Sequence, residues 1–264
     1  MFYITKPVHK KFKKSTNSIM TTPSLVFIIP YRDRKEQLHF FNRQIAYILE
    51  DYAPDTYKIL FVHQCDKRSF NRGALKNIGF LVVKDLYPDT YQDITLVFND
   101  IDTVANRKNY LNFETSKGIV KHFYGFTFAL GGIVSIQASD FELMNGFPNF
   151  WAWGYEDNLL QKRVSQNKLQ IDRQQFHKLM DSRIIHLNES IKRVVNREEY
   201  NRYVFNTNEG IRNIKGVVYT MDESTNFVNV SEFDTGIQEN TTQQKVHDIT
   251  NTDKPFGRLK MQLF

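Results

Sequence analysis

Residues 94–102 read ITLVFNDID, a short apolar run that is followed at once by two acidic residues. The run Ile94–Phe98 has the length and the continuous apolar character of a strand that is buried on both faces. Two similar runs come earlier in the chain, LVFII at 25–29, which Pro30 ends, and YKILFV at 57–62. Strands of this kind are typical of parallel sheets that helices cover on both sides.

The segments between these runs carry apolar residues at helical spacing. One stripe comprises Leu38, Phe41, Ile45, Ile48 and Leu49, and the other comprises Leu75, Ile78, Val82 and Leu86, before Pro88. The order strand, helix, strand, helix, strand predicts an α/β domain with a parallel sheet. Ligands of such sheets bind at the carboxyl ends of the strands. Those ends are PYRDR at 30–34, HQ at 63–64 and DID at 100–102.

The second half of the chain has a more mixed pattern. Phe126–Ile136 is a strand-like run that contains Gly131-Gly132, and glycine in a strand often marks close approach of a ligand or of another backbone. A short helix is predicted over 139–145 and a longer one over 157–169, with apolar positions that include Leu159 and Leu160. We expect these elements to complete a mixed, mainly parallel central sheet.

The composition is that of one globular domain with polar ends. Of the 264 residues, 41% are hydrophobic and 24% are charged, which excludes disorder, collagen and coiled coil as descriptions of the whole chain. Residues 1–24 form a basic N-terminal lead-in, 25–234 the domain, and 235–264 a polar C-terminal tail or packing arm. The net charge of +6 favours an anionic partner, so nucleic acid, a membrane surface and a phosphorylated small molecule all remain open.

Targeting signals and disulfides are not evident in the sequence. No apolar region follows the basic N-terminus, and no stretch approaches the roughly 18 uncharged apolar residues of a membrane span. The single cysteine, Cys65, excludes an intramolecular disulfide and is interpreted as structural. We therefore expect a cytoplasmic protein, unless a native anchor has been removed.

Several residues could carry chemistry. Asp100 and Asp102 could share a divalent cation with the phosphates of a nucleotide, although acidic residues are also common in turns at strand ends. Arginines suit phosphate recognition through their planar forks, and surface arginines are otherwise simply solvated. The candidates are Arg32, Arg34 and Arg72.

The segment WAWGYEDN at 151–158 places both tryptophans of the chain beside two acids. An aromatic face beside a carboxylate is what sugar binding requires, and an acid there could act as general base on a sugar hydroxyl. The alternative is structural, since Glu156 and Asp157 also suit the first turn of a helix and tryptophans often pack in cores. His186 follows an apolar pair and by itself is interpreted as a core residue.

Motifs of other enzyme classes are missing from the sequence. No GxxxxGK[ST], GxGxxG, HExxH or GxSxG pattern occurs, which removes the usual support for P-loop, Rossmann dehydrogenase, zincin and α/β-hydrolase interpretations. The motifs that are present occur in a specific order: IPYRDR at 29–34, FNRGALKNIG at 70–79, DID at 100–102, Gly131-Gly132, NGFPN at 145–149 and FWAWGYED at 150–157.

This ordered set resembles the β-1,4-galactosyltransferase family, inverting glycosyltransferases of the GT-A fold that use a UDP-sugar and Mn²⁺. The motifs span about residues 25–220, and the form FWxWGxED followed by a His-Leu pair is nearest to the branch that galactosylates xylose on proteoglycan linkers. The resemblance implies a single α/β domain with a Rossmann-like nucleotide-sugar site. It also implies a sugar, glycan or glycoprotein acceptor.

The resemblance implies a role for each matching residue. Asp100 matches the acid that contacts the ribose, while Asp102 and His186 match ligands of the manganese ion. Asp157 matches the catalytic base, with Glu156 beside it. The remaining donor-binding positions are Pro30, Arg32, Arg34, Phe70, Arg72, Gly132 and Trp153, the last of which matches the tryptophan of a small mobile loop.

Departures from the family pattern bear on the substrate and on the metal. Asn158 replaces a second Asp that helps to hold the acceptor, and Ala152 replaces the glycine between the tryptophans. Arg183 and Asn188 stand where the branches carry a Met or a second His ligand, so that the metal site is either weaker or completed by Asn188 or water. Galactose-specific members carry Tyr at the position of Ala129, and we hypothesise that this chain admits UDP-GalNAc or UDP-GlcNAc as well as, or instead of, UDP-Gal.

The sequence thus predicts a metal-dependent inverting glycosyltransferase that moves galactose or an N-acetylhexosamine. Two alternatives remain. One is a catalytically degenerate member that binds nucleotide sugar or glycan, suggested by the departures above. The other is a nucleic-acid-binding protein, suggested by the charge, although the basic residues form no RRM, KH or helix-turn-helix pattern.

Overall fold

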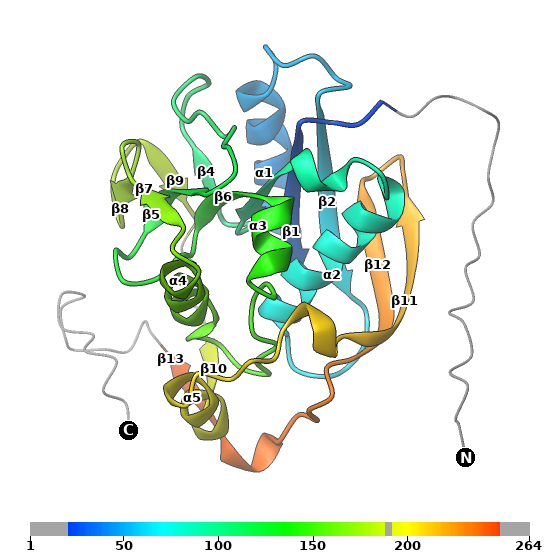
Figure 1. The fold of residues 1–264 in the computed structure, drawn as a ribbon, viewed down its shortest axis with the longest axis vertical. Helices are drawn as coiled ribbons and strands as arrows, with labels where there is room; N and C mark the ends of the chain where they lie inside the picture. Colours follow the sequence, from blue (N-terminus) through cyan, green and yellow to red (C-terminus); the bar gives the residue numbers. More distant parts are fainter. Residues whose placement is uncertain (1–20, 188–191, 249–264) are drawn as a thin grey trace.

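A mixed nine-stranded sheet runs through the molecule (Figure 1). The computed structural model describes residues 21–187 and 192–248. The strand order is β11-β12-β2-β1-β3-β6-β5-β7, with β8 also paired to β5. The strands are β1 Leu25–Tyr31, β2 Tyr57–Gln64, β3 Thr95–Asn99, β5 Ile119–Gly125, β6 Ile133–Gln137, β7 Gln170–Asp172, β8 His177–Lys178, β11 Lys215–Asp222 and β12 Phe227–Asp234.

The predicted parallel core of this sheet is confirmed. β1 pairs parallel with β2 and with β3, and β12 extends the parallel set on the far side of β2. β6 enters antiparallel to β3 and to β5, which makes the whole sheet mixed. The architecture is therefore α/β with a mixed, largely parallel central sheet, as the sequence predicts.

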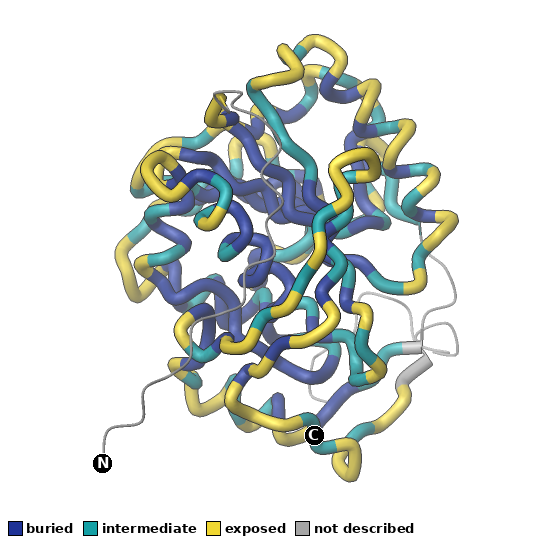
Figure 2. The backbone as a smooth tube through the Cα atoms, turned by 90° about the vertical axis from the view of Figure 1, so that its right-hand side faces the viewer, coloured by how far each residue is buried: buried dark blue, intermediate teal, exposed yellow. Residues whose placement is uncertain are grey.

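Alternate residues of β1 lie in two separate cores, because successive side chains of a strand point to opposite faces. Val26 and Ile28 pack with α2 (Arg72–Leu86), α3 (Ala138–Leu143) and α4 (Glu156–Gln166). Leu25, Phe27 and Ile29 pack with the apolar stripe of α1 (Lys35–Ile48) on the other face. Figure 2 shows the buried strands inside the molecule and the exposed segments around its periphery.

Pro30 does not end the first strand, contrary to the prediction. β1 continues to Tyr31 and stays paired with β2 along its whole length. The pairing with β3 stops earlier, at Ile28 opposite Phe98. Proline has no N–H to donate and is tolerated in a strand where no neighbour needs that donor. Pro30 therefore lies beyond the last residue of β1 that pairs with β3, and on that side of the strand no partner needs an N–H group from it.

The strand-like run at 126–136 is also predicted wrongly in part. Residues 126–132 form a loop between β5 and β6, and only the end of the run is a strand. Gly125 and Gly132 have φ angles of 130° and 70°, which favour glycine and allow the chain to turn between the two strands. Phe126 and Phe128 in this loop are exposed, so their apolar character does not mark a buried strand.

Residues 235–248 pack against the domain. β13 (Gln244–Asp248) pairs antiparallel with β10 (Lys192–Asn196), and both lie beside α5 (Arg197–Val204) at the lower end of Figure 1. A second small sheet joins β4 (Thr103–Ala105) to β9 (Ile184–His186). Short 3-10 helices occupy Tyr91–Asp93, Ile211–Asn213 and Thr241–Gln243. Within the described residues, no helix combines the length and the apolar character needed to cross a membrane.

Candidate active site

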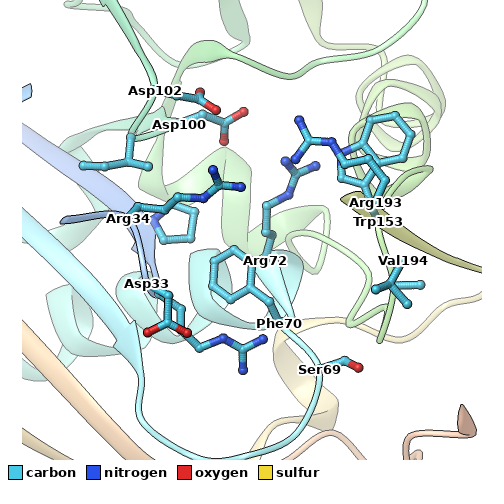
Figure 3. Close-up of a pocket in the computed structure, with 14 residues that line it drawn as sticks. Asp33, Arg34, Ser69, Phe70, Arg72, Asp100, Asp102, Trp153, Arg193 and Val194 are labelled. Atoms are coloured by element: carbon cyan, nitrogen blue, oxygen red, sulfur yellow. The ribbon is translucent and has the colours of Figure 1, made fainter. Parts of the chain in front are cut away.

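A cavity of about 390 Å³ opens at the carboxyl ends of β1 and β3. This is the edge at which parallel α/β sheets place their ligands. Most of the predicted donor-binding residues line it, together with one predicted metal ligand, and several of them are shown in Figure 3: Pro30, Arg32, Arg34, Phe70, Arg72, Asp100, Asp102 and Trp153. The structure therefore brings these predicted residues together around one cavity.

Arginines face the acid pair across the cavity. Figure 3 shows the guanidinium groups of Arg34 and Arg72 directed toward Asp100, with Arg193 beside Arg72. Arg72 begins α2, and the side chain of Asn71 caps that helix by accepting a hydrogen bond from the Ala74 amide. Cationic forks around an open polar cavity are suited to bind a diphosphate.

Asp102 and His186 face each other, because β4 and β9 pair with Thr103 opposite His186. The imidazole Nε2 lies 3.9 Å from Asp102 Oδ1. Thr103 Oγ1 donates to the same carboxylate oxygen at 2.9 Å, and Tyr124 Oη lies 3.2 Å from His186 Nδ1. Both ligand groups are therefore oriented by neighbours, as is typical of metal-binding residues.

A carboxylate oxygen and an imidazole nitrogen form a donor set that suits Mn²⁺ and related divalent ions. Among residues 21–187 and 192–248, no three His, Cys, Asp or Glu side chains gather closely enough to hold a metal by themselves. Arg183 does not join the pair, since its Nε donates to Asp181 at 2.8 Å. Asn188, the other position considered for this site, lies outside the described residues.

Lys76 is a buried cation between two acids of the site. Its side chain is 2% exposed, and its Nζ lies 3.3 Å from Asp157 Oδ1 and 3.7 Å from Asp100 Oδ1. Burial by itself would lower the pKa of Lys76, but Asp157 and Asp100 outweigh that effect and raise it. Lys76 therefore stays charged, and it connects the base predicted from the sequence to the donor-side acid.

Asp157 has an unusually high pKa for an aspartate. Burial raises its pKa to about 6, and Glu156 and Asp100 act in the same direction, while Lys76 and Arg72 oppose them. A carboxylate whose pKa is shifted toward neutrality is a better general base than an ordinary aspartate. Asp157 does not line the cavity itself but lies at its inner edge, 3.9 Å from the Arg72 guanidinium.

Glu156 is placed differently from its neighbour. Its side chain is 3% exposed, and its Oε1 accepts hydrogen bonds from Nε and Nη2 of Arg72. The structure thus directs Glu156 to Arg72 and away from the cavity. Burial opposes the charge of Arg72, but Glu156 and then the other acids raise the pKa of that guanidinium.

The two tryptophans have separate roles. Trp151 is buried, stacks on Phe233 at 5.6 Å, and donates from Nε1 to the Ile237 carbonyl. Trp153 lines the cavity, and its amide donates to the Val194 carbonyl at 2.7 Å. Only Trp153 can offer an aromatic face to a ligand, and Trp151 belongs to the core.

Gly132 serves the backbone beside the acid pair. It does not line the cavity, and its carbonyl accepts a hydrogen bond from the Asp100 amide at 3.0 Å. A Cβ at this position would lie 2.5 Å from the Tyr124 carbonyl oxygen, and its φ of 70° is unfavourable for other residues. Gly132 therefore stabilises the turn that carries Asp100 through a backbone hydrogen bond, from outside the cavity.

Cys65 is exposed, which corrects the interpretation of this residue as structural. Its Sγ lies 3.4 Å from His63 Nδ1, a partner that the sequence spacing did not suggest. Burial of the thiol and the nearby Asp66 raise the pKa of Cys65. The thiol is therefore not activated as a nucleophile.

Sequence reasoning missed two charged residues of this site. Lys76 lies within the FNRGALKNIG motif, one helical turn after Arg72, and this i, i+4 spacing is the signal that could have indicated it. Arg193 lines the cavity from β10, and burial together with Arg72 lowers its pKa to about 10. No local signal indicates Arg193, because its position depends on how β10 folds back onto the site.

The fold and the site together define the class of protein, a GT-A nucleotide-sugar enzyme fold with the acid pair after β3. A model of the N-terminal region of glycosyl transferase group 7 matches residues 6–113, and a model described as the N-terminal domain of galactosyltransferase matches residues 120–202. The chain belongs to the β-1,4-galactosyltransferase family, as its motifs suggest.

Similar proteins agree with this assignment. The chain is 29% identical to a xylosylprotein 4-β-galactosyltransferase of Caenorhabditis elegans over 56% of its length and 53% of that protein. It is 31% identical to mouse β-1,4-galactosyltransferase 1 over 60% of its length and 41% of that protein. The chain thus spans about half the length of these relatives.

Solved structures share the fold. The catalytic domain of Drosophila β-1,4-galactosyltransferase 7, in complex with xylobiose, superposes with a TM-score of 0.66 at 22% identity, covering 79% of this chain and 93% of that one. A mutant of the same Drosophila protein, in complex with manganese, UDP-Gal and xylobiose, gives a TM-score of 0.62. The GT-A fold predicted from the sequence is confirmed by these matches.

Proposed function

We propose that this chain is a metal-dependent inverting glycosyltransferase that moves a hexose from a UDP-sugar to a hydroxyl of a glycan or glycoconjugate. The observation that carries the proposal is the placement of Asp157. Its carboxylate, with a pKa near 6, is held by Lys76 beside Asp100 at the edge of a cavity lined by arginines. A poised base beside a site for a diphosphate is the arrangement that such a transfer requires.

The donor would occupy the cavity with its diphosphate among the arginines. Arg32, Arg34, Arg72 and Arg193 all line that space, and Phe70 offers an apolar surface beside Arg32. The Arg32 guanidinium lies 5.3 Å from the Phe70 ring centroid and donates from Nη1 to the Arg68 carbonyl. These contacts hold Arg32 in place before a ligand arrives, which lowers the entropic cost of binding.

Asp102 and His186 fit a divalent cation, and they would hold it against the donor diphosphate. Two protein ligands leave several coordination positions open, and phosphate oxygens and water commonly fill such positions. A bound Mn²⁺ would offset the negative charge that develops on the departing UDP. The Drosophila protein, whose structure contains manganese and UDP-Gal, supports this choice of ion and of nucleotide.

Asp157 would then accept the proton of the acceptor hydroxyl. The acceptor oxygen forms its bond to the anomeric carbon on the face opposite the diphosphate, while the bond from that carbon to UDP breaks. One displacement inverts the anomeric carbon and requires no covalent sugar–enzyme intermediate. The proton remains on Asp157 until it is passed to solvent.

The choice of donor sugar is proposed to depend on Ala129. This small residue lies in the loop before Gly131, and the amide of the next residue, Leu130, donates to the Asp157 carbonyl at 3.0 Å. A tyrosine at this position, as in galactose-specific members, would occupy space beside the base. Ala129 is buried and does not line the cavity, so the proposal is that a donor N-acetyl group enters beside its small side chain and that UDP-GalNAc or UDP-GlcNAc is accepted.

Release of UDP from UDP-Gal, UDP-GalNAc and UDP-GlcNAc, measured with xylosides and other glycosides as acceptors, tests the proposal. Asp157→Asn should lower turnover by about 1,000-fold, the middle of the range for removal of a general base, while UDP affinity is retained. Asp234→Asn, at an exposed aspartate of β12, is the matched control and should behave like wild type. Strict preference for UDP-Gal would exclude the role of Ala129.

A wild-type protein that binds UDP with Mn²⁺ but transfers no sugar to any acceptor would instead indicate a degenerate nucleotide-sugar-binding member.

A further inference from the structure

Lys76 is placed where an amphipathic helix would normally carry an apolar residue. It lies in the second turn of α2, flanked by the buried Leu75 and Asn77, and its side chain is 2% exposed. Burial of an unpaired ammonium is costly, and burial becomes tolerable when the charge is matched by anions nearby. The acids of the site provide that match, so the lysine and the two carboxylates form one electrostatic unit.

The surroundings of Lys76 leave it little freedom. Its Nζ lies 4.6 Å from the centroid of the Phe147 ring, and the carboxylates of Asp157 and Asp100 lie 3.3 and 3.7 Å from it. Gly73, on the preceding turn, allows the helix to approach the chain closely, since a Cβ there would lie 1.9 Å from the Pro148 carbonyl oxygen. The close approach fixes the depth at which Lys76 enters the site.

Two asparagines, at the N-cap and in the second turn of α2, form hydrogen bonds with residues 147–149. Asn77 Oδ1 accepts from the Phe147 amide at 2.9 Å, and Asn77 Nδ2 donates to the Phe147 carbonyl at 2.8 Å. Asn71 Nδ2 donates to the Asn149 carbonyl at 3.1 Å. These buried bonds hold the helix in register with the chain that leads into Asp157, so the separation between Lys76 and Asp157 is set by the fold.

We propose that Lys76 is a positioning residue for sugar transfer, which fixes the orientation and the charge of the Asp157 carboxylate and links that base to the donor-side Asp100. The inference rests on the proposed function, because it assigns Asp157 the role of base. Lys76 itself touches neither the cavity nor a reacting atom. It acts through the carboxylate that it holds.

The charged groups that face Asp157 determine the expected effect. Lys76 and Arg72 on α2 favour its ionised form, whereas Glu156 on α4 and Asp100 after β3 disfavour it. Removal of the Lys76 charge therefore raises the pKa of Asp157. Since the base must be ionised to accept a proton, transfer is lost as the pH falls through this pKa, and the acidic limb moves to higher pH.

The experiment compares kcat/KM across the pH range for wild type, Lys76→Met, Lys76→Gln and a control, Lys84→Met. Lys84 lies on the same helix but pairs with Glu142 at the surface, and its replacement should leave the profile unchanged. Both Lys76 variants should shift the acidic limb upward by about one pH unit, with about tenfold lower activity near pH 5, only about twofold lower activity near pH 7, and recovery at alkaline pH. A uniform loss at every pH would overturn the proposal and show a merely structural role.

The titration of Asp157 can also be followed without substrate, through the ¹³Cγ resonance of labelled aspartate that disappears in Asp157→Asn. The Lys76 variants should raise the midpoint of this titration, and an unchanged midpoint in folded protein would overturn the proposal. This readout separates two failures. If wild type transfers no sugar, the proposed function is wrong, whereas the resonance still decides whether Lys76 controls Asp157.

Discussion

Arg72 binds the carboxylate of Glu156 through two of its nitrogens, with Nε 2.9 Å from Oε1. The next residue, Asp157, faces Lys76 instead and keeps 17% of its side chain exposed, compared with 3% for Glu156. Two consecutive acids in the first turn of α4 therefore have different partners. Under the proposed function, Glu156 holds an arginine of the donor site, and Asp157 remains available to the acceptor.

Glu156→Gln should destabilise the fold and should also change the pH dependence. Loss of one member of a buried pair costs about 3 kcal/mol, because the guanidinium loses its counter-charge. Glu156 raises the pKa of Asp157, so its neutralisation lowers that pKa and moves the acidic limb of kcat/KM to lower pH. Urea unfolding and a pH–rate profile measure the two effects. Full stability with no transfer would instead show that Glu156 acts directly on substrate.

Gly131→Ala should impair turnover and preserve donor binding. A Cβ at Gly131 would lie 2.4 Å from Asp157 Oδ2 and 2.9 Å from its Cγ, so the carboxylate must shift from its present position. A displacement of about 1 Å at a reacting group costs on the order of 100-fold in rate. Steady-state kinetics and calorimetry with UDP separate the two quantities. A loss of UDP affinity equal to the loss of kcat would contradict this account.

Metal removal should weaken the complex with UDP, and Asp102 and His186 should affect UDP affinity only through the metal ion that they are proposed to bind. Asp102→Asn or His186→Ala should reduce UDP affinity in the presence of Mn²⁺ by roughly tenfold to 100-fold, and neither should matter once the metal is chelated. Calorimetry with and without a chelator gives both comparisons. Equal effects in the two conditions would mean that the residues bind nucleotide and not the ion.

The chain beyond 234 should affect donor binding through Ser69, which lines the cavity. Glu239 accepts from the Ser69 amide at 3.0 Å and from its hydroxyl, and Gln244 donates to Glu239 at 2.8 Å. Glu239→Ala removes these bonds and should cost about 1 kcal/mol of stability and about tenfold in UDP affinity. Glu232→Ala, at an exposed position of β12, is the control. Identical UDP affinity in both variants would contradict the prediction.

The parts of the site that sequence patterns reveal come from the first half of the chain. Buried apolar runs identify β1, β2 and β3, and the rule for parallel sheets then places Arg32, Arg34 and Asp100 together. The sequence gives no role to Lys76, because a lysine on an amphipathic helix is normally solvated. Its burial depends on acids that are distant in sequence, and no local pattern reports them.

The remaining errors also involve non-local structure. The phenylalanines at 126 and 128 resemble strand residues, but the glycines on either side allow the chain to turn there. Arg193 lies against Trp153 at the cavity, on a strand, β10, that is held in place by β13. Five residue pairs join these two strands, which are about 50 positions apart in the sequence. Such pairings are decided by packing and not by the periodicity of one segment.

The pairing of β10 with β13 has a consequence for biosynthesis. A polypeptide leaves the ribosome from its N-terminus, so Arg32, Arg72 and Asp157 emerge well before Gln244–Asp248, whose strand secures the wall that carries Arg193. The sheet can assemble while that wall still lacks its partner strand. During synthesis, the nucleotide pocket should therefore be the last region to mature, and UDP should be captured only after residues 244–248 have left the ribosome.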